Sequence, residues 1–251
     1  MTAKTEAHEL AKPELPKRRS ANRPKRYMSA SERERVILEE AVAFFARHGF
    51  EGQTRELAKR IGMTHSAIYR HFPSKEALIE RVYEHVYLSR WDPAWATLIT
   101  DQSRSLESRL TEFYLQYVAR VFDYAWVRIF VFSGMKGYDI IPRYLDIVRA
   151  QLVEPACREM RHELGLADTA ERPLSVRETE LFWGLHGRIF YLAIRRFVYG
   201  TATPGDLEPI VRDGVKSFFV GGTEVIRAIL DDNADAPASH CKRAAETVQG
   251  L

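Results

Sequence analysis

Residues 54–72, TRELAKRIGMTHSAIYRHF, decide how the N-terminal part of this chain folds. The pattern predicts two short helices joined by a tight turn. Gly62 supplies the backbone freedom that such a turn requires, and Thr64 is a favoured residue at the start of a helix. Apolar residues spaced as on helix faces, Leu57, Ile61, Ile68 and Phe72, would hold both helices against a preceding one.

Two structures fit this pattern. One is a helix-turn-helix, which presents its second helix to the major groove of DNA. The other is an ordinary pair of helices with a solvated basic face. The polar side chains suit the first, because Arg70 can bond bidentately to guanine, and Ser66 or His65 can reach base edges. Tyr69 offers a hydroxyl to phosphate, and Lys75 begins the next helix, where the helix dipole favours an anion.

The segment before this motif predicts one longer helix. Ser31 and Glu34 have the form of a capping box, with Ser31 as the N-cap, and Gly49 ends the helix. The positions 37, 41, 44 and 45 form its apolar face. Residues 1–29 are polar, proline-containing and basic, which predicts a disordered arm that either reaches a minor groove or is only solvated. Residues 232–251 are expected to form a flexible tail.

The segment after the motif is helical almost throughout. Ser74 can cap a fourth helix that runs to about residue 91, where Pro93 breaks it. Further helices are predicted at 106–121, 124–135, 140–164, 176–199 and 206–230, with a loop at 165–175. The helix at 124–135 is apolar nearly all round, so we expect it to be buried on most sides. Because no alternating strand pattern of useful length occurs, the predicted fold class is all-α.

Composition fits a soluble globular protein. The 251 residues are 45% hydrophobic and 28% charged, and no long apolar run predicts a membrane span or a secretory signal. Two cysteines, Cys157 and Cys241, are too few for a disulfide framework, so we expect a cytoplasmic protein. Residues 1–90 contain 18 Lys and Arg against 12 Asp and Glu, and the remainder 19 against 22. This asymmetry favours a polyanionic partner, although it can arise by chance.

Motifs of common enzymes are missing from the sequence. It contains no HExxH, no G-x-S-x-G, no phosphate-binding P-loop and no G-x-G-x-x-G. Cys157 and His162 are five residues apart and off one helical face, so they do not predict a metal pair. We therefore expect no enzymatic activity, no cofactor and no metal.

Residues 33–79 resemble the DNA-binding domain of the TetR/AcrR family of bacterial transcriptional regulators. The matching segments are AVAFF at 41–45, GF at 49–50, LA at 57–58, GMT at 62–64, IYRHF at 68–72 and SKEAL at 74–78. The resemblance implies a three-helix DNA-binding domain at 30–76 and a helical effector-binding and dimerisation domain at 77–231.

The resemblance also implies the residues that contact DNA. They are Thr54, Arg55, Thr64, His65, Ser66, Ala67, Tyr69, Arg70, His71 and Lys75. Thr64 to Ala67 would face bases, whereas Tyr69, His71 and Lys75 would contact phosphates. One departure affects this assignment: the segment between Gly49 and Leu57 is one residue shorter than the family pattern. The cap of the second helix is then Gln53 or Thr54, and Arg55 is placed less firmly than Tyr69.

For the C-terminal domain, the resemblance implies a homodimer that reads a pseudo-palindromic double-stranded operator, with the last two helices at the interface. Five glycines in those helices, at 184, 187, 214, 221 and 222, indicate either close helix packing or local kinks. The family also implies a pocket for a small-molecule effector. The candidate lining residues are Phe113, Tyr117, Trp126, Arg128, Phe130, Trp183, His186 and Phe190, although aromatic stripes are more often plain core.

Polar residues among these apolar neighbours are the better pointers to a pocket, since a buried polar group needs a partner. They are Arg128, Arg188 and His186. Arg128 could bind an acidic ligand or pair with a carboxylate in the core. The function expected from the resemblance is a repressor released by an effector that moves the helix at about 74–91. The alternative is an architectural DNA-binding protein without an effector.

Overall fold

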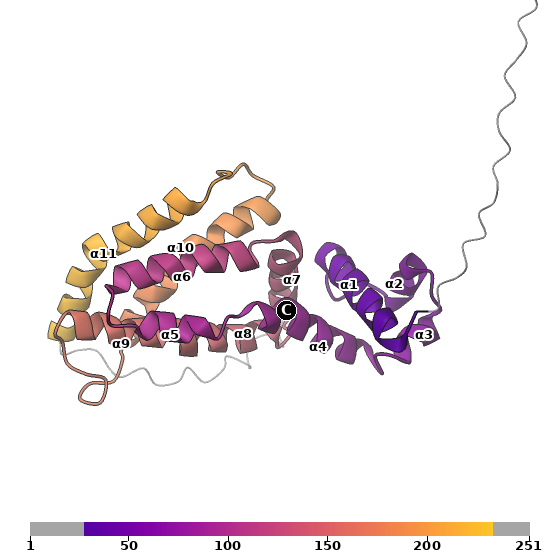
Figure 1. Ribbon diagram of the computed structural model, residues 1–251, viewed down its shortest axis with the longest axis horizontal. Helices are drawn as coiled ribbons and strands as arrows, with labels where there is room; N and C mark the ends of the chain where they lie inside the picture. The colour runs from indigo at the N-terminus through magenta and orange to yellow at the C-terminus, as the bar shows by residue number, and fades with distance from the viewer. Residues whose placement is uncertain (1–27, 233–251) are drawn as a thin grey trace, which may run out of the picture.

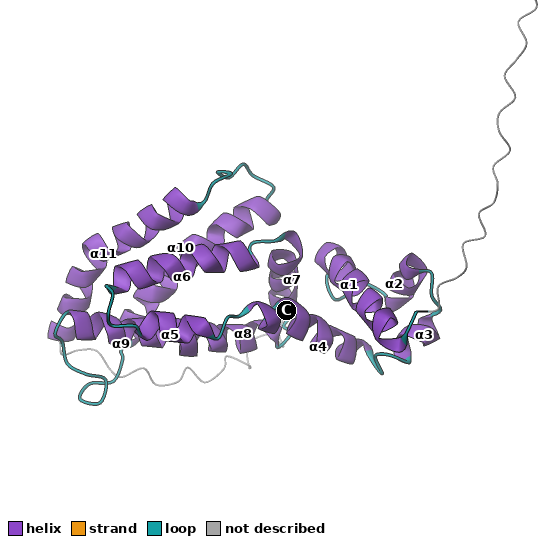
Figure 2. Cartoon of the chain, viewed as in Figure 1, coloured by secondary structure: helices purple, strands orange, loops and turns teal. Residues whose placement is uncertain are grey.

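The computed structural model describes residues 28–232, and this part of the chain is built from helices joined by turns and loops, with no strand (Figure 2). The predicted all-α fold is thus confirmed for these residues. Most of the predicted basic arm and of the predicted tail lie outside them. None of the described helices is long and apolar enough to span a membrane.

The helices divide into a small N-terminal head and a larger body (Figure 1). The head consists of α1 (Ala30–His48), α2 (Thr54–Ile61) and α3 (His65–Tyr69), and α4 (Lys75–Val86) leads from it to the body. The body contains α5 (Ala94–Thr100), α6 (Leu106–Val121), α7 (Tyr124–Met135), α8 (Ile140–Val148), α9 (Glu154–Glu163), α10 (Val176–Phe197) and α11 (Glu208–Asp231). A 3-10 turn (Leu88–Arg90) follows α4, and a π-helical segment (Arg149–Val153) joins α8 to α9.

The first helix begins two residues earlier than predicted. Its capping box is formed by Ser29 and Glu32, where Ser29 Oγ accepts from the Glu32 amide at 3.1 Å and Glu32 Oε2 accepts from the Ser29 amide at 2.8 Å. The predicted box of Ser31 and Glu34 has the same spacing, but the earlier start adds intrahelical hydrogen bonds to a helix already nucleated. Gly49 ends the helix as predicted, with φ of 67°.

Two helix ends and one additional helix also differ from the prediction. α3 ends at Tyr69 rather than Phe72, and α4 ends at Val86, so the predicted helix to residue 91 is shorter and continues only as the 3-10 turn. The seven-residue α5 was not predicted, because it offers only Trp95 and Ile99 as a buried face. The predicted helix at 140–164 is confirmed as one helical run through the π segment.

α7 lies between the head and the pocket-bearing part of the body. It packs against α1, α8 and α10. Trp126, Val127, Ile129 and Ser133 are buried, whereas the end residues Tyr124 and Met135 are exposed. The prediction that this helix is covered on most sides therefore holds for its middle and fails at its two ends.

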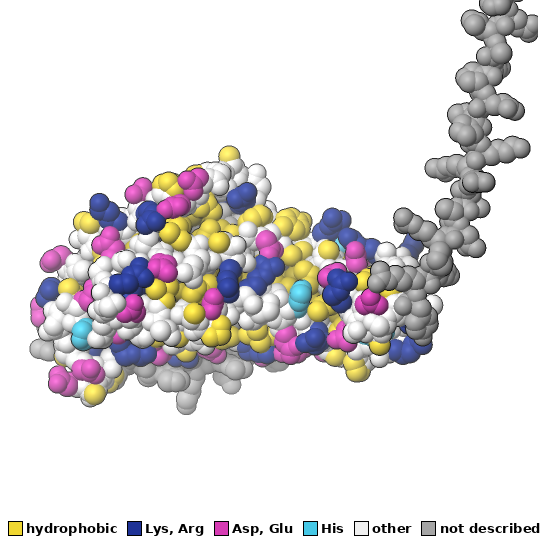
Figure 3. All heavy atoms as spheres, viewed as in Figure 1, with side chains coloured by type: hydrophobic (Ala, Val, Ile, Leu, Met, Phe, Trp, Pro, Cys, Tyr) yellow, Lys and Arg dark blue, Asp and Glu magenta, His cyan; other side chains and the backbone are white. Residues whose placement is uncertain are grey.

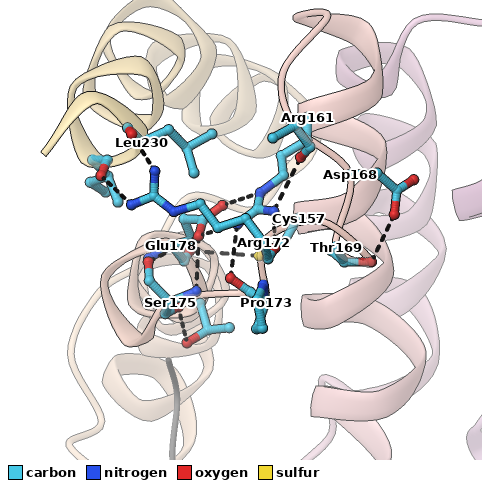
Figure 4. Close-up of polar contacts among 12 residues, drawn as sticks. Cys157, Arg161, Asp168, Thr169, Arg172, Pro173, Ser175, Glu178 and Leu230 are labelled. Carbon is cyan, nitrogen blue, oxygen red and sulfur yellow. Dashed lines mark hydrogen bonds and ion pairs between the residues drawn. The ribbon is translucent and has the colours of Figure 1, made fainter. Parts of the chain in front are cut away.

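A buried ion pair fixes the loop between α9 and α10 (Figure 4). Arg161 on α9 donates to both carboxylate oxygens of Glu178 on α10, at 2.7 Å each, and both side chains are at most 2% exposed. The same guanidinium donates to the carbonyls of Ala167, Arg172 and Pro173 in the loop. Burial alone would raise the pKa of Glu178, but hydrogen bonds from Arg161 and Ser175 outweigh it and lower that pKa.

We predict that Arg161→Met destabilises the chain by about 3–5 kcal/mol, because it leaves the Glu178 carboxylate buried without its counter-ion. The free energy of unfolding from urea titration measures this loss. As a control, Arg35→Met breaks the exposed Arg35–Glu39 pair on α1 and should cost about 0.5 kcal/mol or less.

The double variant Arg161→Met with Glu178→Met removes both charges and should recover part of the lost stability. Equal destabilisation by Arg161→Met and by Arg35→Met would show that the buried pair does not hold this loop.

Candidate DNA interface and ligand pocket

The head has the geometry of a helix-turn-helix. Leu57 and Ala58 on α2 and Ile68 on α3 are buried in the same hydrophobic core as α1, and α2 packs against both α1 and α3. Gly62 ends α2 in the left-handed region, with φ of 74°, and the Thr64 hydroxyl caps α3 by accepting from the Ala67 amide at 3.2 Å. These features confirm the two predicted helices and the turn between them.

The short turn before α2 depends on Gly52. A Cβ atom at this position would lie 2.4 Å from Cε1 of Phe44 on α1, a distance that real side chains do not reach. Gln53 is the N-cap of α2 and makes no side-chain cap bond, so Thr54 is the first helical residue. The turn before α2 is thus closely packed on Phe44.

Thr54 links α2 to α3. It is 7% exposed, and its hydroxyl lies 2.9 Å from Nε2 of His65 and 3.1 Å from the Tyr69 hydroxyl. The rings of His65 and Tyr69 meet edge to face at 4.7 Å. The sequence predicted Thr54 at the DNA surface, whereas the structure buries it behind the side chains of His65 and Tyr69 on α3. Its hydroxyl holds both of these side chains in position.

The other residues expected at DNA lie on one helix-turn-helix unit and the start of α4. Four are exposed, namely Arg55, Thr64, Ser66 and Arg70. Five are half-buried, namely His65, Ala67, Tyr69, His71 and Lys75. The Arg60 side chain, outside the expected set, bonds Glu40 on α1 at 2.8 Å and ties α2 to the head.

The body contains an aromatic pocket of about 320 Å³ among α6, α7, α8 and α10. Six of the eight predicted lining residues line it: Tyr117, Trp126, Phe130, Trp183, His186 and Phe190. The sequence missed Tyr144, Leu145, Glu180 and Gly187. Tyr144 could have been found as a further aromatic on the apolar face of 140–164. Glu180 and Gly187 gave no signal, because a charged residue and a glycine on a helix ordinarily indicate solvent or a kink.

Two predicted lining residues lie outside this pocket. Phe113 is fully buried against Trp95 and Tyr117 and belongs to the core. Arg128 points away from the pocket, because successive residues on a helix are separated by about 100° and position 128 is nearly opposite Trp126 and Phe130.

Arg128 connects three helices instead. Its Nε donates to the Ala46 carbonyl near the end of α1 at 2.8 Å, and Nη1 donates to the Phe197 carbonyl at the end of α10 at 3.4 Å. The rings of Tyr124 and Phe132 flank the guanidinium at 5.1 and 5.0 Å. Arg188, also expected among buried groups, is exposed and donates to Ser217.

The buried imidazole and the two buried phenols of the pocket are uncharged at neutral pH. Burial lowers the pKa of His186 to about 4 and raises the pKa of Tyr117 and Tyr144. The hydroxyl groups of these two tyrosines lie 3.5 Å apart. Among the described residues, Trp126 Nε1 and His186 Nδ1 are buried without a hydrogen-bond partner.

Apolar side chains and glycines are exposed on α10 and α11, where Figure 3 shows a group of hydrophobic surface atoms. Tyr191, Val220 and Val225 are 53%, 73% and 43% exposed. A Cβ at Gly184, Gly187 or Gly221 would have no neighbouring atom within 4 Å, whereas one at Gly214 would lie 3.4 Å from Ile189 Cδ1. Close packing within the described residues therefore explains Gly214 but not the other three. The three atoms nearest to a Cβ at Gly222 belong to Phe218 of its own helix.

Comparisons with known proteins agree with this geometry. Residues 37–82 match the family model described as bacterial regulatory proteins, tetR family. A search of curated protein sequences finds no match.

Several solved structures share the fold. A TetR-like transcriptional regulator from Rhodococcus sp. RHA1 is 16% identical, with 78% of this chain and 98% of that chain covered and a TM-score of 0.57. The TetR-family regulator PfmR from Thermus thermophilus is 18% identical, with 72% and 96% covered and a TM-score of 0.52. A TetR-family regulator from Pseudomonas syringae pv. tomato str. DC3000 is 18% identical, with 77% and 97% covered and a TM-score of 0.51.

We predict that the buried His186 makes the chain less stable in mild acid. The pKa of His186 is lowered from 6.5 to about 4, so between these values the unfolded chain binds a proton that the folded chain does not. The free energy of unfolding should therefore fall by about 3 kcal/mol as the pH is lowered through this window.

Urea unfolding between pH 4.5 and 7 measures this dependence. His186→Asn should flatten it, while His162→Asn, which replaces an exposed histidine on α9, should leave it unchanged. If the free energy of unfolding depends on pH in the same way for the unaltered chain and for His186→Asn, the buried imidazole is not the neutral group described above.

Proposed function

We propose that this chain, which is a TetR-family transcriptional regulator, is a repressor that binds a pseudo-palindromic operator as a homodimer and is released by a small-molecule effector. Its family is one of transcriptional regulators and not of enzymes, and a regulator of this kind works in the bacterial cytoplasm. The observation that carries the proposal is the helix-turn-helix head joined through α4 and α7 to a body with an aromatic pocket.

The recognition surface combines base readers and phosphate contacts. Arg70 and Ser66 are exposed on and just after α3 and are available for base edges in a major groove. Lys75 in the first turn of α4, together with the Tyr69 hydroxyl, contacts phosphates. Thr54 acts through His65 and Tyr69, because its hydroxyl holds both side chains at the surface.

A second copy of the chain completes the regulator. One head reads too few base pairs to be selective, and a dimer places two heads about one helical turn, roughly 34 Å, apart. The exposed apolar residues on α10 and α11 and the open space at Gly184 and Gly221 support an interface there. Small residues at these positions allow the helices of two subunits to approach closely.

Two helices, α7 and α4, connect the pocket to the head, so that a ligand in the pocket can shift the head. α7 carries Trp126 and Phe130 on its pocket face and Arg128 on its head face. α4 reaches the same wall, since the Tyr87 hydroxyl donates to the Trp126 carbonyl at 3.1 Å, and Arg143 on α8 forms a bidentate pair with Glu80 at 2.8 Å. A ligand that displaces Trp126 therefore strains contacts to both α4 and α1, and a coupling of about 1–3 kcal/mol is enough to switch DNA binding.

The alternative function is an architectural DNA-binding protein without an effector. The unpartnered Trp126 and His186 nitrogens at the pocket favour the regulator, because a buried polar atom without a partner costs free energy that a ligand can recover. An architectural protein would also bind random DNA as tightly as selected genomic fragments.

We predict different effects from the two classes of DNA contact. Lys75→Ala should weaken binding to all duplexes alike and reduce the slope of log affinity against log salt by about 0.9 for the lost phosphate contact. Arg70→Ala should relax the preference at particular base pairs, by about 1–3 kcal/mol of discrimination. Fluorescence anisotropy with selected and random duplexes at several salt concentrations measures both.

The matched control is Arg158→Ala, which removes an exposed positive charge from α9, away from the head. If Lys75→Ala leaves the slope of log affinity against log salt unchanged, Lys75 does not contact a phosphate. Selection of the same sequence motif by Arg70→Ala and by the unaltered chain would remove the base-reading role of Arg70.

We further predict that Arg128→Met weakens binding to a complete operator by about tenfold, or about 1.4 kcal/mol, while leaving binding to a single half-site unchanged. Arg128 does not belong to the DNA surface; it fixes the direction of α1 relative to α7 and α10. Two heads that are no longer held in register lose the benefit of simultaneous contact.

Titration of Arg128→Met and of the unaltered chain with half-site and full-site duplexes of one selected sequence measures the two losses of affinity. An equal loss on both duplexes would mean that Arg128 supports the folding of the head rather than its orientation.

A further inference from the structure

We propose that the pocket takes a small aromatic compound that has no negative charge and carries a hydrogen-bond acceptor, which binds the indole N–H of Trp126. This inference deepens the proposed function, since it rests on the pocket being the effector site. It specifies the chemical class of that effector from the groups that surround it.

The walls of the pocket select a flat, apolar molecule. Six of the ten lining residues are Phe, Tyr or Trp, and their rings meet one another closely. Trp126 and Phe130 are stacked at 5.3 Å with an angle of 8°, and Phe190 packs edge to face on both, at 5.8 and 5.1 Å. Aromatic side chains favour such offset and edge-on contacts with a further ring. The volume, about 320 Å³, is at the small end for ligand pockets, which admits a molecule of one or two rings.

The charges around the pocket exclude an anion. Within residues 28–232, no lysine or arginine lines it, and the one formally charged lining residue is Glu180, which is exposed. Arg128, the cation that the sequence offered for an acidic ligand, is committed to the backbone carbonyls of Ala46 and Phe197 on the other side of α7. A carboxylate or phosphate placed in this pocket would lose its hydration and find no counter-ion.

The hydrogen-bonding groups require an acceptor on the ligand. Trp126 is fully buried, and its Nε1–H, which can only donate, has no partner among the described residues. His186 is 6% exposed, and its Nδ1 is the second buried polar atom of the lining that has no hydrogen-bond partner among the described residues. The carbonyl oxygen of an aromatic ketone, or an acceptor on a related neutral molecule, can accept a hydrogen bond from Trp126. A hydroxyl or amide on the same ring system could also form a hydrogen bond with His186.

Three probes with one ring skeleton test the inference on the unaltered full chain: 2-acetylnaphthalene, 2-ethylnaphthalene and 2-naphthoate. Isothermal titration calorimetry at pH 7 should give the tightest binding for the ketone. The ethyl compound lacks only the acceptor and should bind roughly threefold to tenfold more weakly, as expected for one hydrogen bond. The naphthoate should bind at least tenfold more weakly than the ketone. The proposal is overturned if the naphthoate or the ethylnaphthalene binds as tightly as the ketone. It is also overturned if none of the three probes binds.

Two tryptophan variants test whether the probe binds at the Trp126 N–H. Trp126→Phe keeps a ring but removes the N–H, so the ketone should lose its advantage over the ethyl compound. Trp91→Phe is the matched control, because the Trp91 N–H donates to Gln151 outside the pocket lining and its loss should leave that advantage intact.

A second pair of variants does not depend on replacing a core tryptophan. Gly187→Leu places a side chain at the pocket lining and should abolish binding of the ketone. Gly205→Leu makes the same change in the loop between α10 and α11, outside the lining and at another position where a Cβ meets no neighbouring atom, and should retain it. Ketone binding unaffected by Gly187→Leu would locate the probe elsewhere and overturn the proposal.

Operator binding measured on the same samples separates this inference from the proposed function. If the ketone binds as expected without changing operator affinity, the ligand class stands and the effector mechanism fails. If the chain binds operator but none of the probes, the DNA-binding function stands and the ligand class fails.

Discussion

The contact between α7 and α1, centred on Arg128, is the constraint on which the rest of the molecule depends. The last carbonyls of a helix have no partner inside that helix. Arg128 donates to one such carbonyl at the end of α1, in the head, and to another at the end of α10, in the body. A positive charge is also favourable at the negative ends of two helix dipoles. A single side chain thereby fixes the direction of the DNA-binding head relative to the helix that we assign to the dimer interface.

This contact explains the unusual composition of α7. A helix of 12 residues that is apolar nearly all round has to cover more than one partner, and α7 does so with two stripes. Tyr124, Arg128 and Phe132 share the stripe toward the head, while Trp126 and Phe130 share the stripe toward the pocket. Because a helix moves as a rigid rod over this length, displacement of one stripe displaces the other.

The sequence predicted what depends on local patterns and missed what depends on tertiary direction. The helix-turn-helix, the ends at Gly49 and Gly62 and most pocket aromatics follow from spacing and from residues that suit turns. The sequence offered Arg128 as a pocket residue that binds an acidic ligand or pairs with a core carboxylate. That prediction was wrong, because its partners are backbone carbonyls, which carry no sequence signal. Thr54 was assigned to DNA because of its position in the motif, and only the fold shows that its hydroxyl is used by His65 and Tyr69.

Coupling between the two proposed sites has to act in both directions. If a ligand that displaces Trp126 lowers the affinity of the chain for its operator, then a bound operator lowers the affinity of the chain for the ligand by the same factor. The structure offers a physical reason for such reciprocity, because the wall that the ligand would press on is also hydrogen-bonded to Tyr87, the residue that follows α4, and continuous with Arg128 on α7. In the dimer that we propose, two heads held on one duplex would fix both α1 helices, and through them both α7 helices. The pocket of this DNA-bound dimer would then be the stiffer one, so we expect the ligand to bind best to a molecule whose heads are free to turn.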